Sequence, residues 1–82
     1  MKKDKRILLT AYRLSKEGRD IHTWSVYLRM VDEHYKWMTK ENVGGVLRSS
    51  KDALEKIGTV KTSHNGAMAV YKWVGGDNYF AK

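Results

Sequence analysis

The sequence TVKTSHNGAMAVYKWV at positions 59–74 predicts a β-hairpin. Asn65-Gly66 lies at its centre and supplies two residues that tolerate positive φ, as a type I′ turn requires. Alternation along the two strands then places Val60, Tyr71 and Trp73 against the core. A two-residue loop would give the pairs His64 with Ala67, Ser63 with Met68, Thr62 with Ala69, Lys61 with Val70 and Val60 with Tyr71.

A helical pattern precedes this hairpin over residues 39–57, and Gly58 is expected to end it. Steps of three and four residues build one apolar face. Gly44 and Gly45 each cost about 1 kcal/mol relative to alanine in a helix interior. Either the helix begins near Gly44 after a loop, or the glycines permit a close approach. The face comprises Val43, Val46, Leu47, Ser50, Ala53, Leu54 and Ile57.

Two more helices are expected nearer the N-terminus. The first is capped by Asp4 and closed by Gly18, and the second runs from about Ser25 to Tyr35 with Thr23 or Ser25 as its cap. Residues 19–23 read as an extended link, with a short third strand at 20–22, and residues 36–38 as a turn. The expected apolar stripes are Ile7, Leu8, Ala11, Leu14 and Ser15 in the first helix, and Val26, Tyr27, Met30, Val31 and His34 in the second.

Length and composition restrict the class of protein. Eighty-two residues make one domain with a modest core. The absence of cysteine excludes disulfides and cysteine-ligated zinc, and suits the reducing cytoplasm. The apolar runs are too short to span a bilayer, and the basic start lacks the apolar segment of a signal peptide. A net charge of +7 favours polyanionic partners.

The order helix, link, helix, turn, helix, hairpin resembles the winged helix-turn-helix family. The resemblance is carried by LRSSKDALEKIGTVKTSHNGAMAVYKW at 47–73, where Leu54 and Gly58 lead into a valine-bearing strand, a polar tip and an aromatic return strand. It implies an α+β domain over residues 1–74, with a three-helix core and a C-terminal two-stranded wing. Residues 75–82 are expected to form a flexible tail. Small size and basic composition are similar to those of phage or mobile-element regulators.

The resemblance also implies that the chain binds double-stranded DNA as a transcriptional or replication regulator, in the cytoplasm or on the nucleoid. The third helix would enter the major groove, where the Arg48 guanidinium can bond guanine O6 and N7 together. Gly45 would let this helix sit deeper, and the wing would lie along the phosphates. The candidate DNA-binding residues are Lys40, Asn42, Gly45, Arg48, Ser49 and Lys51 of the helix, and Lys61, Ser63, His64, Asn65 and Lys72 of the hairpin.

A second interpretation is a winged helix that binds an acidic host or partner protein, such as transcription machinery. Glu41 and Asp52 favour it, because carboxylates near phosphates cost energy; alternatively, Asp52 holds Arg48 or Lys56 in place. A homodimer is compatible with either interpretation. The tail residues Tyr79 and Phe80 pack either on the first helix or on a partner subunit. No motif predicts catalysis, a metal or a cofactor, since His22, His34 and His64 lack ligand spacing.

Overall fold

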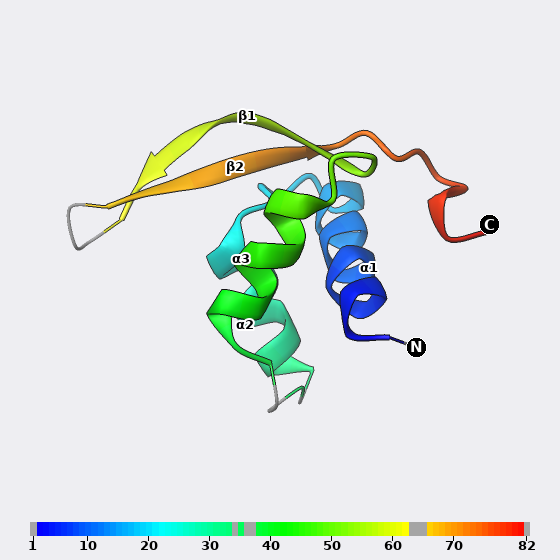
Figure 1. Ribbon diagram of the computed structural model, residues 1–82, viewed down its shortest axis with the longest axis horizontal. Helices are drawn as coiled ribbons and strands as arrows, with labels where there is room; N and C mark the ends of the chain where they lie inside the picture. The colour runs from blue at the N-terminus through cyan, green and yellow to red at the C-terminus, as the bar shows by residue number, and fades with distance from the viewer. Residues whose placement is uncertain (1, 34, 36–37, 63–65, 82) are drawn as a thin grey trace.

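The chain forms three helices followed by an antiparallel β-hairpin, in a computed structural model that describes residues 2–33, 35, 38–62 and 66–81. Figure 1 shows the helices gathered on one side of the hairpin, whose strands extend beyond them. This α+β order is compatible with the winged-helix layout expected from the sequence. The elements are α1 (Lys3–Lys16), α2 (Thr23–Asp32), α3 (Lys40–Ser49), β1 (Leu54–Lys61), β2 (Ala67–Trp73) and a 3₁₀ turn, η1 (Tyr79–Ala81).

Helix α1 confirms the predicted apolar stripe. Its core-facing side chains are buried, and Gly18 closes the helix with a φ of 75°. The predicted cap is wrong: Lys2 holds the N-cap position without a side-chain hydrogen bond, and Asp4 lies inside the first turn, where a carboxylate complements the helix dipole. The buried residues of this helix are Ile7, Leu8, Thr10, Ala11 and Leu14.

Helix α2 begins at Thr23, two residues earlier than expected, because His22 caps it. Ser25 N–H donates to His22 Nδ1 at 3.2 Å, and His22 N–H donates to Ser25 Oγ at 3.0 Å. These reciprocal bonds form a capping box and satisfy two amides at the helix start. The helix ends at Asp32 rather than near Tyr35, and His34 lies outside the described residues.

Helix α3 begins at Lys40, with Thr39 Oγ1 accepting from Asn42 N–H at 3.2 Å. Gly44 and Gly45 therefore lie inside the helix, so the alternative start near Gly44 is wrong. The predicted extension to residue 57 is also wrong, because the helix ends at Ser49 and the chain turns through residues 50–53. Leu47 and Leu54 are seven residues apart, which is also the spacing of two residues on the same face of a helix.

The core lies between the helices and the inner face of the hairpin. Ala53 and Leu54 enter it from the turn and from the start of β1, and Tyr71 enters it from β2, as predicted. The link before α2 contributes Ile21, whose carbonyl accepts from Tyr71 N–H at 2.8 Å. In the described chain, this single bridge takes the place of the short strand expected at 20–22. The largest fully buried side chains are Ile7, Leu14, Ile21, Val26, Met30, Val43 and Leu47.

The hairpin has a different register from the predicted one. Val60 pairs with Met68 instead of Tyr71, and its side chain is 37% exposed rather than in the core. Thr62 and Gly66 exchange hydrogen bonds at the end of the strands, which leaves residues 63–65, outside the described part, to connect them. The observed pairs are Leu54 with Trp73, Glu55 with Lys72, Lys56 with Tyr71, Gly58 with Val70, Thr59 with Ala69, Val60 with Met68 and Lys61 with Ala67.

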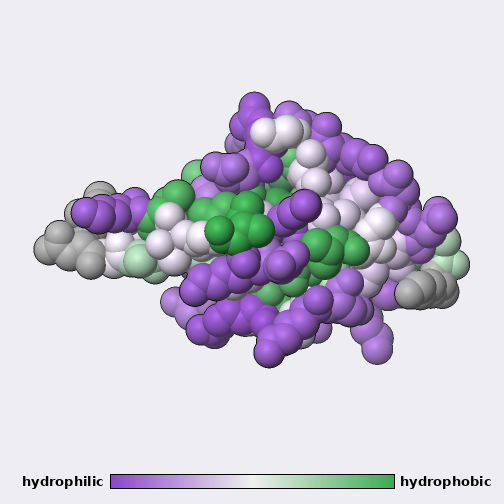
Figure 2. Space-filling view, turned by 90° about the horizontal axis from the view of Figure 1, so that it is seen from above, coloured by the Kyte–Doolittle hydropathy of each residue, from purple (hydrophilic) through white to green (hydrophobic). Residues whose placement is uncertain are grey.

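The register of Val60 is set by the neighbouring pairing of Thr62 with Gly66, and a bulge between Lys56 and Gly58 changes the alternation further along β1. One extra residue in β1 shifts the alternation by one position, so that Leu54, Lys56, Thr59 and Lys61 share the inner face. Gly58, predicted to end a helix, lies within β1 at this bulge. Ile57 is 59% exposed, and Figure 2 shows apolar groups among hydrophilic ones on the face viewed from above.

Asp77 and Phe80 pack back against α1, the first of the two arrangements considered, whereas Tyr79 packs on Trp73 and hydrogen-bonds Asp52. Tyr12 donates from its hydroxyl to Asp77 at 2.9 Å, and its ring lies 6.0 Å from that of Phe80. Trp73 stacks on Phe80 at 5.8 Å and donates from Nε1 to the Gly76 carbonyl at 3.0 Å. The C-terminal segment is therefore joined to the domain by aromatic and polar contacts.

Candidate nucleic-acid interface

A groove runs between α3 and the inner face of the hairpin. It consists of three hollows that share lining residues and is called here the α3–hairpin groove. The basal hollow lies at the end of α3, the central hollow lies along its first half, and the distal hollow lies beside the start of α2 and the outer hairpin. Arg48, Lys56 and Tyr71 line both the basal and the central hollow, while Lys40 and Met68 line both the central and the distal one.

Cationic side chains outnumber carboxylates along this groove. Glu41 lies in the central hollow and Glu55 in the basal one. A concave surface with an excess of one charge concentrates its field, and here the field attracts anions. The cations come from α3, from the turn after it and from both ends of β1: Lys40, Arg48, Lys51, Lys56 and Lys61.

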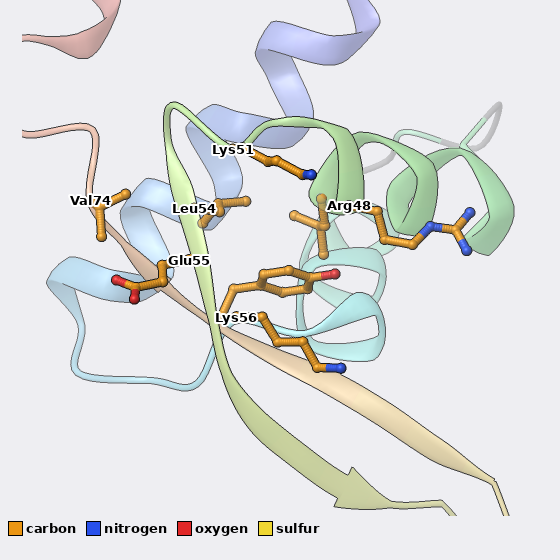
Figure 3. Close-up of a pocket in the computed structure, with 8 residues that line it drawn as sticks. Arg48, Lys51, Leu54, Glu55, Lys56 and Val74 are labelled. Atoms are coloured by element: carbon orange, nitrogen blue, oxygen red, sulfur yellow. The ribbon is translucent and has the colours of Figure 1, made fainter.

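Arg48 and Lys56 form the centre of the positive region. Arg48 extends from α3 and Lys56 from β1, and Figure 3 shows both side chains directed toward the same side, with Glu55 on the other side of β1. Leu47 and Leu54 lie beneath them and are nearly fully buried. Both cations thus lie over a buried apolar floor.

Lys40 stands at the beginning of α3 and is oriented by an aromatic ring. Its Nζ lies 4.3 Å from the centroid of the Trp24 ring. A cation over an indole face is attracted to the ring but keeps its outer side open to solvent. Lys40 is therefore placed where the central and distal hollows meet.

Asp52 does not hold Arg48 or Lys56, as the sequence had allowed. Its Oδ2 accepts from the Tyr79 hydroxyl at 3.0 Å, and its side chain lines none of the three hollows. Burial and the Asp52 carboxylate raise the pKa of Tyr79 above its ordinary value of 10.0. Asp52, one of the two carboxylates that disfavoured an anionic partner, is thus bound to the C-terminal segment.

Four of the predicted site residues line the groove: Lys40, Arg48, Lys51 and Lys61. Four others do not, namely Asn42, Gly45, Ser49 and Lys72. Lys72 follows the inward-facing Tyr71 in β2, so alternation places its side chain on the outer face. Ser63, His64 and Asn65 lie outside the described residues.

Gly44, rather than Gly45, lines the central hollow. A Cβ at Gly44 would lie 3.5 Å from Thr23 Oγ1, an ordinary contact, whereas a Cβ at Gly45 would meet no heavy atom within 4 Å. The helix surface facing the groove is therefore rotated by one residue from the predicted one.

The sequence interpretation missed Lys56 and Thr59, because a helix was expected to continue through residue 57. Both side chains lie on the inner face of β1 and line the central hollow. The signal that could have identified them was the glycine at 58 between β-branched residues, which is compatible with a bulged strand.

No other chemical centre is apparent in the described residues. They contain no group of three or more His, Cys, Asp and Glu side chains suited to a metal ion. None of the helices in residues 2–33, 35, 38–62 and 66–81 has the length and apolar character needed to cross a membrane. Comparison with protein-family models, with curated proteins and with solved structures finds no match for this chain.

Proposed function

We propose that this chain binds double-stranded DNA as a winged helix-turn-helix domain and acts as a transcriptional or replication regulator. In this arrangement α2 and α3 form the helix-turn-helix and the hairpin forms the wing. The observation that carries the proposal is the α3–hairpin groove, where Arg48 of α3 and Lys56 of β1 line the same basal and central hollows.

Most of the binding free energy would come from lysines that neutralise phosphates. Lys56 and Lys61 share one face of β1, separated by the bulge, and can follow one strand of the duplex backbone. Such contacts are independent of sequence. They release counterions, so affinity falls steeply as the salt concentration rises.

Sequence preference would come from α3. Arg48 is exposed, and its planar guanidinium can donate two hydrogen bonds to one guanine in the major groove. Gly44 removes side-chain bulk from the helix surface that lines the groove. The backbone of α3 can therefore approach base edges more closely there than an alanine would permit.

The test is fluorescence anisotropy with a labelled random-sequence duplex over about 50 to 200 mM salt. Lys56→Ala should reduce the slope of log affinity against log salt by about 1, since each phosphate contact contributes about 0.9. Lys72→Ala is the matched control, because it removes one charge from the outer face of the same hairpin. Absence of duplex binding by the wild-type chain, or an equal loss in Lys72→Ala, would contradict the proposal.

A second candidate function is binding of an acidic protein partner. Glu41 in the central hollow and Glu55 in the basal one favour it, because each would lie near a phosphate in a DNA complex. In-vitro selection from random duplexes at near-physiological salt separates the two functions. An enriched motif supports DNA binding, whereas weak, salt-sensitive retention without enrichment favours the protein partner.

A further inference from the structure

The solvent-facing side of α2 carries an apolar stripe. Trp24 is 38% exposed, Leu28 54% and Val31 44%. Their spacing of four and three residues places them on one side of the helix, opposite the buried Val26 and Met30. A surface helix normally carries polar side chains at such positions, so a row of three large apolar ones indicates a contact surface.

The two ends of this stripe carry opposite charges. Lys40 is held over the Trp24 ring at 4.3 Å, which gives the N-terminal end a positive group. Asp32 follows Leu28 by four residues, so its exposed carboxylate lies on the same side at the C-terminal end. The Arg29 guanidinium is bound by Glu17 at 2.6 and 2.7 Å, so its attraction to Asp32 is the weaker one and it forms no ion pair with that carboxylate.

We propose that this stripe is where a second copy of the chain docks, with the two α2 helices antiparallel about a two-fold axis at Leu28. Trp24 and Asp32 each lie four residues from Leu28, so the symmetry sets Trp24 of one copy against Asp32 of the other. Lys40, stacked on Trp24, then lies beside that carboxylate. The contact is self-complementary in both shape and charge, as an isologous interface must be.

This contact requires no DNA, because both its apolar and its charged parts lie within the protein, although Trp24 and Lys40 also line the distal hollow of the groove. Antiparallel helices also align the positive end of each helix dipole with the negative end of the other. Pairing would relate two α3–hairpin grooves by a two-fold axis. The oligomeric state is therefore measured without DNA, which separates failure of this inference from failure of the proposed function.

Sedimentation equilibrium over micromolar to about 1 mM protein spans the range in which weak dimers dissociate. The wild-type chain of 9.5 kDa should approach twice that mass. Leu28→Glu should raise the dimer dissociation constant by at least roughly tenfold, because it places two like charges at the axis. Ile57→Glu, at a similarly exposed position on the hairpin, should leave the constant unchanged. Circular dichroism checks that both variants fold.

The charge pattern gives a sharper test. Asp32→Lys alone and Lys40→Asp alone should each dimerise weakly, because like charges then meet at both ends of the interface. An equimolar mixture of the two variants should restore dimers, since every pair of ends is again opposite in sign. A wild-type chain that stays monomeric to about 1 mM would overturn the inference and leave the stripe to a different protein. A mixture no more associated than its components would overturn the antiparallel register.

Discussion

Arg48 on α3 and Lys56 on β1 line the same two hollows of the α3–hairpin groove. Eight positions apart in the chain, they reach one surface because the turn at residues 50–53 and the start of β1 lie between them. Their chemical difference makes separate predictions possible. A guanidinium can recognise a base edge, whereas an ammonium acts on a phosphate as a point charge.

Arg48→Ala and Lys56→Ala should therefore have different effects on the affinity and the base preference of DNA binding. Arg48→Ala should weaken binding to a selected duplex by about 1–3 kcal/mol and relax the preference at one base pair. Lys56→Ala should weaken binding to all duplexes alike and reduce the salt slope by about 1. Titration of the selected duplex and of single-base variants distinguishes these results. Equal loss of preference in both variants would remove Arg48 from direct recognition.

Gly45→Ala should stabilise the protein by about 1 kcal/mol, because alanine favours the helix interior and its methyl group enters open space. For a domain of this size the gain corresponds to a rise in Tm of roughly 4–8 °C. Calorimetry measures it. Gly44→Ala supplies the comparison: it should stabilise as well but weaken duplex binding, since Gly44 lines the groove and Gly45 does not. Similar duplex affinities for both variants would argue against close approach at Gly44.

Ser25→Ala should destabilise the protein by about 1 kcal/mol, since it removes the acceptor for His22 N–H. The Ser25 hydroxyl also donates to the Asp20 carbonyl at 2.9 Å, which fastens the link to the helix. Urea denaturation followed by circular dichroism gives the free energy of unfolding. Ser49→Ala, at an exposed position near the end of α3, should change it by less than about 0.5 kcal/mol.

The contact of Asp77 with α1 predicts a pH dependence of stability. Hydrogen bonds from Lys16 and then from Tyr12 hold the pKa of the Asp77 carboxyl below its ordinary value of 3.8. A carboxyl with a lowered pKa in the folded state stabilises above its ordinary pKa, and this contribution is lost as the pH falls through the lowered value. Asp77→Asn should therefore be less stable than the wild type at pH 7, and the two should converge below pH 3.8.

Denaturation series at several pH values measure this convergence. Asp20→Asn is a suitable control, because the Asp20 side chain has no hydrogen bond or ion pair within the described part of the chain. A difference between the wild type and Asp77→Asn that stays constant down to acidic pH would show that the charge of Asp77 does not stabilise the fold.

Phe80→Ala should destabilise the domain by about 1–2 kcal/mol, although the residue lies close to the C-terminus. Its ring stacks on Trp73 and lies edge-on to Tyr12 and Tyr79, and such ring pairs contribute about 0.5–1.5 kcal/mol each. Urea unfolding monitored by tryptophan fluorescence measures the change. An unaltered unfolding curve would mean that the Phe80 ring contacts add nothing to stability.

The first two helices could be predicted because apolar residues repeat at helical spacing in both, although Val31, expected on the buried stripe of α2, is 44% exposed. Ile7, Leu8, Ala11 and Leu14 are buried as expected. The His22 cap could not be predicted, since the use of Nδ1 as an acceptor depends on the orientation of the ring. Thr23 and Ser25 offered more common capping residues one and three positions later.

The end of α3 could not be predicted from the sequence, and neither could the register of the hairpin. Periodicity records which residues face the core but not whether they reach it from a helix or from a strand. Leu54 is buried as expected, yet it belongs to β1. Lys56 was missed because a helix was expected there, and Val60 was misplaced because the pairing of Thr62 with Gly66 shifts the register by three residues.

The attachment of the C-terminal segment to α1 has a practical consequence. Figure 1 shows η1 at the end of the molecule remote from the end of β1 and the start of β2. An affinity tag or a biosensor linker joined beyond η1 would therefore emerge away from that part of the hairpin. Immobilised in that orientation, the protein would present the α3–hairpin groove to the flowing solution rather than to the chip.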